Sequence, residues 1–261
     1  LRRVYGGDNL GNVWRFDING NVGAPGFDAQ RLATLRGPGA GAVQPVTSRP
    51  ELGIVAGRTV VYVGTGRYLG VSDLADARVQ SIYAIVDPLD TTDHGNPRTS
   101  GHFVQQTLTD STCPAGNSIC AVGEQVRTGS ALAVNLATQA GWFVDLPVSL
   151  ERVNTDPQLA LGTLVVNSNI PTPDACSAGG DSYINFLDLR TGAPVANAQG
   201  VASVFLGRAI ATRPTVVRLP GGRIISLTRM SDDSTVVRNV PVSVAGQATR
   251  RLSWRELAVE R

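Results

Sequence analysis

The sequence predicts an all-β protein, and three observations support this class. Turn-forming residues are abundant, with 29 Gly and 15 Pro among 261 residues. Val, Thr and Ile dominate the apolar runs, as is typical of strands. No run shows a sustained helical period, whereas a short strand–turn–strand pattern recurs along the chain. A chain of this length can bury a stable core as one large β domain or two small ones.

The clearest copy of the recurring pattern is a hairpin at residues 3–17. Val4 and Tyr5 end an apolar strand, Gly, Asp and Asn residues supply a turn, and residues 13–17 resume apolar and polar alternation. A second copy lies at residues 180–192, where a strand ends in Asp188 and a Gly turn, and a looser copy lies at 81–88.

The remaining elements follow from runs of strand-forming residues separated by Gly, Pro and Asp. Two long irregular stretches, 20–57 and 87–126, are the places where binding usually resides on a rigid scaffold. The predicted strand-like runs are 4–17, 59–64, 80–87, 131–145, 162–168, 182–189, 213–219 and 223–229.

Grouped as sheets of about four strands, these runs suggest four or so blades of a modified β-propeller with long inserted loops. A β-sandwich is the alternative, but a repeated hairpin ending in Asp and a turn favours radial repetition over a Greek key. We therefore expect residues 1–261 to be a single β-propeller domain or the C-terminal blades of a larger one.

Composition and charge exclude several function classes. All 23 basic residues are Arg, so the chain has no lysine for a Schiff base or a Walker-type phosphate loop. The net charge is only +2 and the Arg residues are scattered, which argues against a nucleic-acid partner. No apolar run reaches the length of a membrane helix, and no signal-peptide core precedes the first strand, so we expect a mature or truncated chain.

The cysteines predict a disulfide more readily than a metal site. Cys113 and Cys120 enclose a polar, turn-forming hexapeptide that a disulfide would close. A zinc site would need four ligands, and His94 and His102 lack the usual spacing. Cys176 has no evident partner and is expected to be buried or to bond a cysteine outside this segment.

The acidic residues and the tryptophans each have a functional and a structural interpretation. Asp87, Asp90 and Asp93 form an oxygen-rich loop that could hold Ca²⁺, but their spacing of three favours solvated turn caps. Asp8 and Asp17 sit at strand ends, where backbone capping is commoner than acid/base catalysis. We expect no catalytic, cofactor or metal residues in this segment. The three tryptophans, at 14, 142 and 254, are expected to be anchors between blades, with exposed adhesive aromatics as the alternative.

The assembled pattern resembles the C-terminal domain of the PilY family, which comprises tip-associated adhesins and biogenesis factors of bacterial type IV pili. Each segment alone is weak, but their order along almost the whole chain is specific. The carrying segments are residues 5–17, 61–69, 81–87, 141–147, 151–153, 176–180 and 253–257.

This resemblance implies a non-enzymatic, exported protein that passes through the periplasm to the pilus tip or outer cell surface. There it would act in pilus biogenesis, adhesion and the balance of extension against retraction, with minor pilins, the pilus tip and a host-surface receptor as partners.

The resemblance also implies a calcium loop, which in the family lies immediately before the segment that matches Tyr5. In this numbering the loop would lie upstream of Leu1, where the chain begins. Calcium is therefore expected in the full-length protein, with no ligand carried onto this chain. We also expect an upstream segment to complete the propeller.

Two alternatives come from other classes. The turn from Asp188 to Gly192 resembles the repeat turn of quinoprotein propellers, which would imply a pyrroloquinoline quinone dehydrogenase; no adjacent Cys-Cys pair supports that cofactor. The other alternative is a purely structural interaction propeller that binds minor pilins and no host surface.

Overall fold

The computed structural model describes residues 3–18, 29–172, 179–242 and 250–251. These residues form four β-sheets, and the described part of the chain contains no α-helix, only three short 3-10 turns. The turns are η1 (Pro38–Ala40), η2 (Val71–Ala75) and η3 (Ala196–Ala198).

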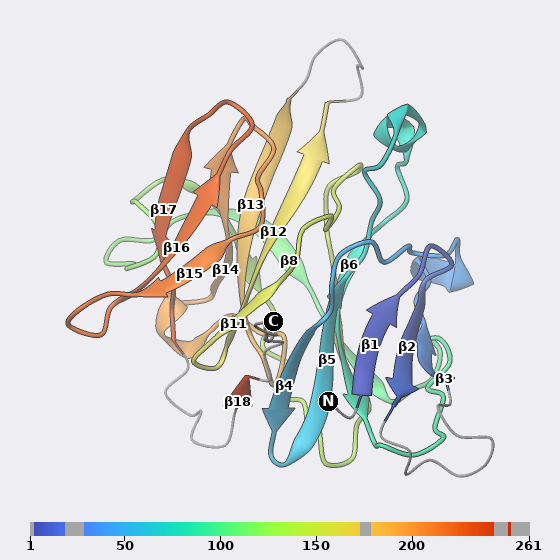
Figure 1. The fold of residues 1–261 in the computed structure, drawn as a ribbon. Helices are drawn as coiled ribbons and strands as arrows, with labels where there is room; N and C mark the ends of the chain where they lie inside the picture. The colour runs from blue at the N-terminus through green and yellow to red at the C-terminus, as the bar shows by residue number, and fades with distance from the viewer. Residues whose placement is uncertain (1–2, 19–28, 173–178, 243–249, 252–261) are drawn as a thin grey trace, which may run out of the picture.

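The first strands of the four sheets follow one another along the chain, but β8 and β9 join the third sheet before β10 completes the second, and the C-terminal β18 returns to the second sheet (Figure 1). The first sheet has the order β1 (Arg3–Gly7), β2 (Asn12–Asp17) and β3 (Ala29–Thr34). The second has the order β18 (Arg250–Arg251), β4 (Glu51–Val55), β5 (Arg58–Gly64), β6 (Ser81–Asp87), β10 (Gly141–Asp145) and β7 (Phe103–Gln106).

The third sheet has the order β11 (Gln158–Ala160), β12 (Thr163–Pro171), β13 (Gly180–Asp188), β14 (Val201–Gly207), β9 (Gln125–Gly129) and β8 (Leu108–Thr112). The fourth has the order β15 (Thr215–Arg218), β16 (Ile224–Arg229) and β17 (Thr235–Asn239). The pairings are antiparallel except that of β7 with β10, which is parallel.

Successive sheets pack face to face. Alternate residues of β5 belong to different cores, because successive side chains of a strand point to opposite faces. Val61 packs with residues of the first sheet, whereas Val60 packs with residues of the third. A further cluster joins the third and fourth sheets. Because a sheet covered on both faces buries the side chains on both sides of its strands, those strands are continuous apolar runs.

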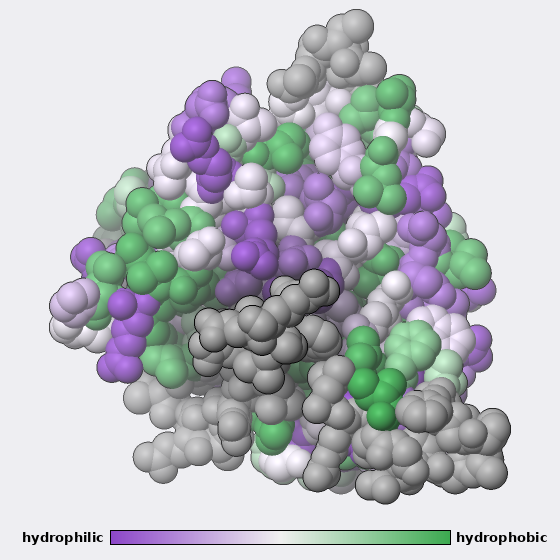
Figure 2. Space-filling model, viewed as in Figure 1, coloured by the Kyte–Doolittle hydropathy of each residue, from purple (hydrophilic) through white to green (hydrophobic). Residues whose placement is uncertain are grey.

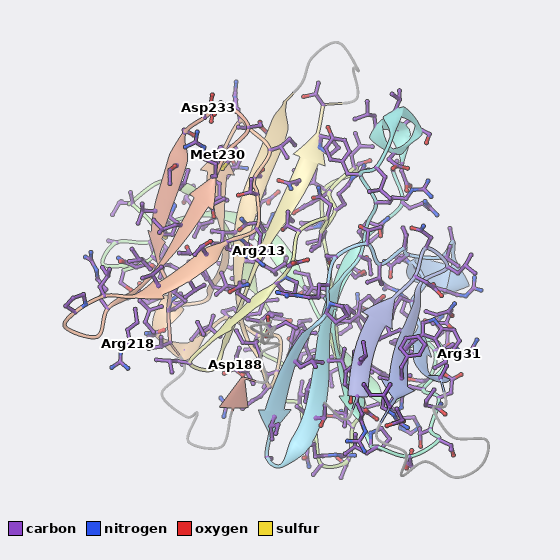
Figure 3. The ribbon with its side chains drawn as sticks, in the orientation of Figure 1. Arg31, Asp188, Arg213, Arg218, Met230 and Asp233 are labelled. Atoms are coloured by element: carbon purple, nitrogen blue, oxygen red, sulfur yellow. A yellow bond between two sulfur atoms is a disulfide. The ribbon has the colours of Figure 1, made fainter. Side chains whose placement is uncertain are left out.

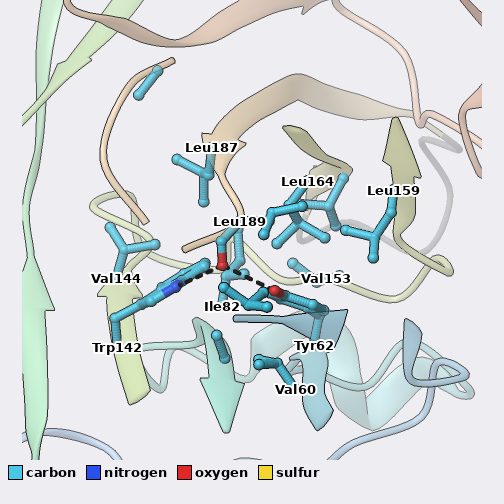
Figure 4. Packing of buried hydrophobic residues seen from close by; sticks show 14 of the residues in the cluster. Val60, Tyr62, Ile82, Trp142, Val144, Val153, Leu159, Leu164, Leu187 and Leu189 are labelled. Atoms are coloured by element: carbon cyan, nitrogen blue, oxygen red, sulfur yellow. Dashed lines mark hydrogen bonds between the residues drawn. The ribbon is translucent and has the colours of Figure 1, made fainter. Parts of the chain in front are cut away.

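The core between the second and third sheets is tied by hydrogen bonds as well as by apolar contact. The Tyr62 hydroxyl and the Trp142 indole N–H both donate to the carbonyl of Leu189, at 2.9 Å and 3.2 Å (Figure 4). Trp142 is fully buried, so the structure confirms it as an anchor between sheets. Trp14 instead donates to Asp8 within its own hairpin.

The hairpin at residues 3–17 and the strands at 81–87 and 180–188 are confirmed, but other boundaries were wrong. The predicted run 131–145 is a strand only at β10, because Asn135 caps a turn ahead of it. The stretch 20–57 contains β3 and β4, and the stretch 87–126 contains β7 and β8. The predicted runs also omitted the whole of β9, as well as β11, β14, β17 and β18.

Candidate interaction surface

The loop between β5 and β6 is built around a buried carboxylate. Asp73, in the middle of the short turn η2, accepts hydrogen bonds from the backbone N–H of Leu69 at 2.8 Å and of Gly70 at 3.2 Å. It also pairs with Arg67 at 2.7 Å. Burial acts to raise the pKa of Asp73, but the hydrogen bonds from Leu69 and Arg67 outweigh it and lower that pKa. The ionised carboxylate therefore fixes the path of the loop.

Arg152 holds the same loop from beneath. Its guanidinium is almost fully buried and donates to the carbonyls of Arg67 at 2.8 Å, Asp73 at 2.6 Å and Asp76 at 3.1 Å. A fourth bond, to Leu150 at 2.8 Å, orients the side chain. Burial lowers the pKa of Arg152, yet its hydrogen bonds are charge-assisted and strong. Residues far apart in the sequence thus fix one rigid loop.

Glycine makes this contact possible. A Cβ at Gly66 would lie 2.3 Å from the Cβ of Arg152, and φ at Gly66 is +126°, so a side chain there would be strained as well. A Cβ at Gly64 would lie 2.2 Å from a methyl carbon of Val153. The predicted segments 61–69 and 151–153 therefore pack directly against each other.

On the other side of the 150–153 segment, Glu151 enters the third sheet. Its carboxylate accepts from Arg127 at 2.7 Å and from Ser168 at 2.6 Å, and both ion-pair side chains are fully buried. The Arg127 guanidinium lies over the Tyr183 ring, 3.6 Å from the centroid. Burial acts to lower the pKa of Arg127, but Glu151 outweighs it and raises that pKa. These polar contacts lie inside the protein and hold the 150–153 segment against the third sheet.

Two apolar side chains of the loop face outward, whereas Leu74 is buried. Leu69 and Val71 are 73% and 72% exposed, which places them among the most exposed large apolar side chains of the described residues. Hydrophobic surface lies at the upper right of Figure 2, where Figure 1 draws η2. A rigid loop with apolar side chains at its tip is suited to binding a partner.

The structure places the three candidate calcium ligands in separate interactions. Asp87 is buried between the first two sheets and accepts from Tyr5 at 2.6 Å and Arg15 at 2.8 Å. The carboxylates of Asp90 and Asp93 cap nearby backbone amides. Asp93 also pairs with Arg31 of the first sheet, a residue that Figure 3 labels. Among the described residues, no group of three or more His, Cys, Asp or Glu side chains could hold a metal ion.

Asp8 and Asp17 have structural partners. The Asp8 carboxylate accepts from the backbone of Leu10 and Asn12, as the turn-capping interpretation predicts. Asp17 differs, because its buried carboxylate forms ion pairs with Arg3 at 2.8 Å and Arg15 at 2.7 Å instead of capping amides.

Cys113 and Cys120 form a disulfide that closes a loop beside the fourth sheet. Cys113 is buried with residues of the core between the third and fourth sheets. The carbonyl of Ser118, inside this loop, accepts from Asn239 of β17, and Glu124, just after the loop, forms an ion pair with Arg238 of the same strand. The predicted disulfide is therefore present, and its loop is held against the last sheet.

Three sequence-based predictions concern Leu1, Cys176 and Trp254, which lie outside the described residues. The calcium loop implied by the family resemblance would lie upstream of Leu1, so it stays a prediction for the full-length protein. The burial or external pairing of Cys176 and the anchoring role of Trp254 likewise stay predictions.

Sequence analysis missed the roles of Arg152, Arg127 and Asp73. The 151–153 segment was noticed, but its binding partners are up to 85 residues away in the chain. The local sequence offered no signal of the buried Arg127 pair, because β9 reads Gln-Val-Arg-Thr-Gly and Arg127 stands among other polar residues.

The chain was compared with known proteins. No protein-family model matches it. A type IV pilus biogenesis factor PilY1 homolog of Xylella fastidiosa is 29% identical over 98% of this chain and 21% of its own length. The type IV pilus biogenesis factor PilY1 of Pseudomonas aeruginosa is 29% identical over 72% of this chain and 19% of its own length. The chain thus spans about a fifth of these relatives, and the resemblance to the PilY family is confirmed.

A solved structure shows the same fold. The crystal structure of the Pseudomonas aeruginosa PilY1 C-terminal domain superposes with a TM-score of 0.69 at 20% identity, covering 92% of this chain and 57% of that one. That domain is a β-propeller, so the prediction of an all-β modified propeller is confirmed. No helix in the described part of the chain has the length and hydrophobicity to cross a bilayer.

Proposed function

We propose that this chain is the C-terminal propeller region of a type IV pilus biogenesis factor, displayed at the pilus tip or outer cell surface. The observation that carries the proposal is an alignment over 98% of the chain to a relative of that name, together with a shared fold. Because the chain spans a fifth of that relative, the role is proposed for the longer protein to which such a region belongs.

Within this role the region acts in pilus biogenesis, adhesion and the balance of extension against retraction, without enzymatic activity. The carboxylates of Asp8, Asp17 and Glu151 all hold the fold together. Because these three groups have structural roles and not acid/base roles, they favour a binding function over a catalytic one. Minor pilins, the pilus tip and a host-surface receptor are the proposed partners, and calcium is proposed for the full-length protein outside this segment.

The test is an in-frame deletion of this segment from the full-length gene. Export is checked by blotting, and pilus display, twitching motility and surface attachment are measured. A full-length protein carrying Val122→Ser, a change at an exposed loop position, serves as the control. We expect normal export with reduced piliation or motility in the deletion strain. Normal piliation, motility and attachment would contradict the proposal, and the quinone-dehydrogenase alternative would then be tested by adding pyrroloquinoline quinone and measuring absorbance and turnover.

A further inference from the structure

The β5–β6 loop combines a rigid base with an apolar tip. Asp73 and Arg152 fix its backbone through the hydrogen bonds described above. Leu69 and Val71 project from this base into solvent. A loop already held in one conformation loses little entropy when it binds, so its apolar contacts contribute more fully to affinity.

The charges around the tip are arranged unequally. In the Arg67–Asp73 pair the Arg side chain is 35% exposed and the Asp side chain 2%. In the Arg78–Asp76 pair the Arg side chain is 36% exposed and the Asp side chain 10%. Each pair is formally neutral, but the cationic ends face solvent and the anionic ends are buried. A partner that surrounds the tip would therefore meet positive charge at its rim.

We infer that the tip formed by Leu69 and Val71 docks into an apolar pocket on another protein, and that carboxylates line the rim of that pocket. The inference rests on the proposed function in one respect, which is that the partner is sought on the piliated cell. It names the surface of this chain that binds the partner and the chemistry that the partner must offer.

A protein fits this tip better than an anionic membrane does. Attraction to an anionic bilayer usually involves a cluster of roughly four to eight Lys or Arg residues. Here the two nearby guanidiniums, those of Arg67 and Arg78, are each held by a buried carboxylate. Within the described β5–β6 loop, residues 65–80, the aromatic side chains that favour the bilayer interface are represented only by the half-buried Tyr68.

The test places a photoreactive residue, p-benzoylphenylalanine, at position 69 of the full-length protein in its piliated host. The same residue at position 122 is the matched control, because Val122 is also 72% exposed in a loop. We expect a discrete adduct with a second polypeptide from position 69 and none from position 122. Mass spectrometry should map the adduct to an apolar surface flanked by Asp or Glu.

Two further variants test the pocket, each made in the protein that carries p-benzoylphenylalanine at position 69. Val71→Asp should lower adduct yield by about tenfold or more, since it removes an apolar contact and adds a charge that the rim repels. Val71→Arg should retain more adduct than Val71→Asp, because an acidic rim tolerates a cation better. Val122→Asp should leave the yield unchanged.

Several results would overturn the inference. These are the absence of an adduct, an adduct within the same polypeptide, an adduct mapped to a surface without carboxylates, and a Val71→Asp variant that performs as well as Val71→Arg. Wild-type protein that sediments with phosphatidylglycerol vesicles, with binding lost in Val71→Asp and kept in Val122→Asp, would favour a membrane instead. A mapped adduct with a protein unrelated to pili, combined with normal piliation after segment deletion, would support the docking and contradict the pilus function.

Discussion

Glu151 and Arg152 are neighbours in the chain, and their buried side chains bind different parts of the propeller. The Glu151 carboxylate pairs with Arg127 of the third sheet, whereas the Arg152 guanidinium binds carbonyls of the β5–β6 loop of the second sheet. Successive side chains of an extended backbone point in opposite directions, so two adjacent residues can serve both purposes. This segment thereby couples the packing of two sheets to the shape of the proposed docking loop.

The Glu151–Arg127 pair gives the first prediction. Glu151→Leu should lower the free energy of unfolding by about 3–5 kcal/mol, because it removes the buried partner of the Arg127 charge and leaves only the longer contact with the exposed Asp110. The double variant Arg127→Met/Glu151→Leu should recover much of the loss, since both charges are gone. Urea unfolding of the three proteins is the measurement. A single variant within about 1 kcal/mol of wild type would contradict a tightly buried pair.

The disulfide gives the second prediction. Cys113→Ala/Cys120→Ala should lower the free energy of unfolding by about 2–3 kcal/mol, as expected for closing a loop of this length. Thermal unfolding with and without reductant is the measurement. Reductant should lower the Tm of the wild type and leave the double variant unchanged. An equal response of both proteins would show that the bridge does not stabilise the fold.

The third prediction concerns pH. The pKa of Asp73 is lowered in the folded state, so its stabilising effect is complete above the ordinary carboxyl pKa near 4. As pH falls below that value, the unfolded chain takes up a proton before the folded one does, and stability decreases until the folded pKa is passed. Asp73→Asn should therefore lose less stability than wild type between pH 7 and pH 3.

The control for the pH experiment is Asp233→Asn. The Asp233 side chain is 92% exposed, so this variant should keep the wild-type pH dependence. Chemical unfolding at each pH gives the comparison. If Asp73→Asn followed the wild-type curve, the buried carboxylate would not be the titrating group that stabilises the loop.

The close packing at Gly64 gives the fourth prediction. Gly64→Ala should lower the free energy of unfolding by about 1–3 kcal/mol, because the added methyl group would overlap Val153. Gly70→Ala, in the loop that follows β5, should have little effect, since nothing lies within 4 Å of a Cβ there. Equal stability of the two variants would mean that the segments at positions 64 and 153 are less closely packed than the structure indicates.

Local sequence was informative wherever an element depended on its own residues. The hairpin of β1 and β2 was predicted because its turn residues and alternating strands lie within 15 positions, and β6 because it is a continuous apolar run. In contrast, β3 reads Ala-Gln-Arg-Leu-Ala-Thr, with little β propensity, and forms a strand because it pairs with β2. The exposed, polar β8 likewise owes its structure to pairing with β9.

The sequence by itself determined the all-β class, the recurring hairpins and the resemblance to the PilY family, because these depend on residue type and order over short distances. Tertiary structure alone decided which partners the buried charged side chains bind, since Arg152 donates to the Arg67 carbonyl across 85 positions and Asp87 accepts from the Tyr5 hydroxyl across 82. It also decided which apolar side chains stay outside the cores. Leu69 and Val71 are as hydrophobic as their buried neighbours in β5, and they face solvent because the hydrogen bonds of Asp73 and Arg152 hold the loop backbone away from the sheets.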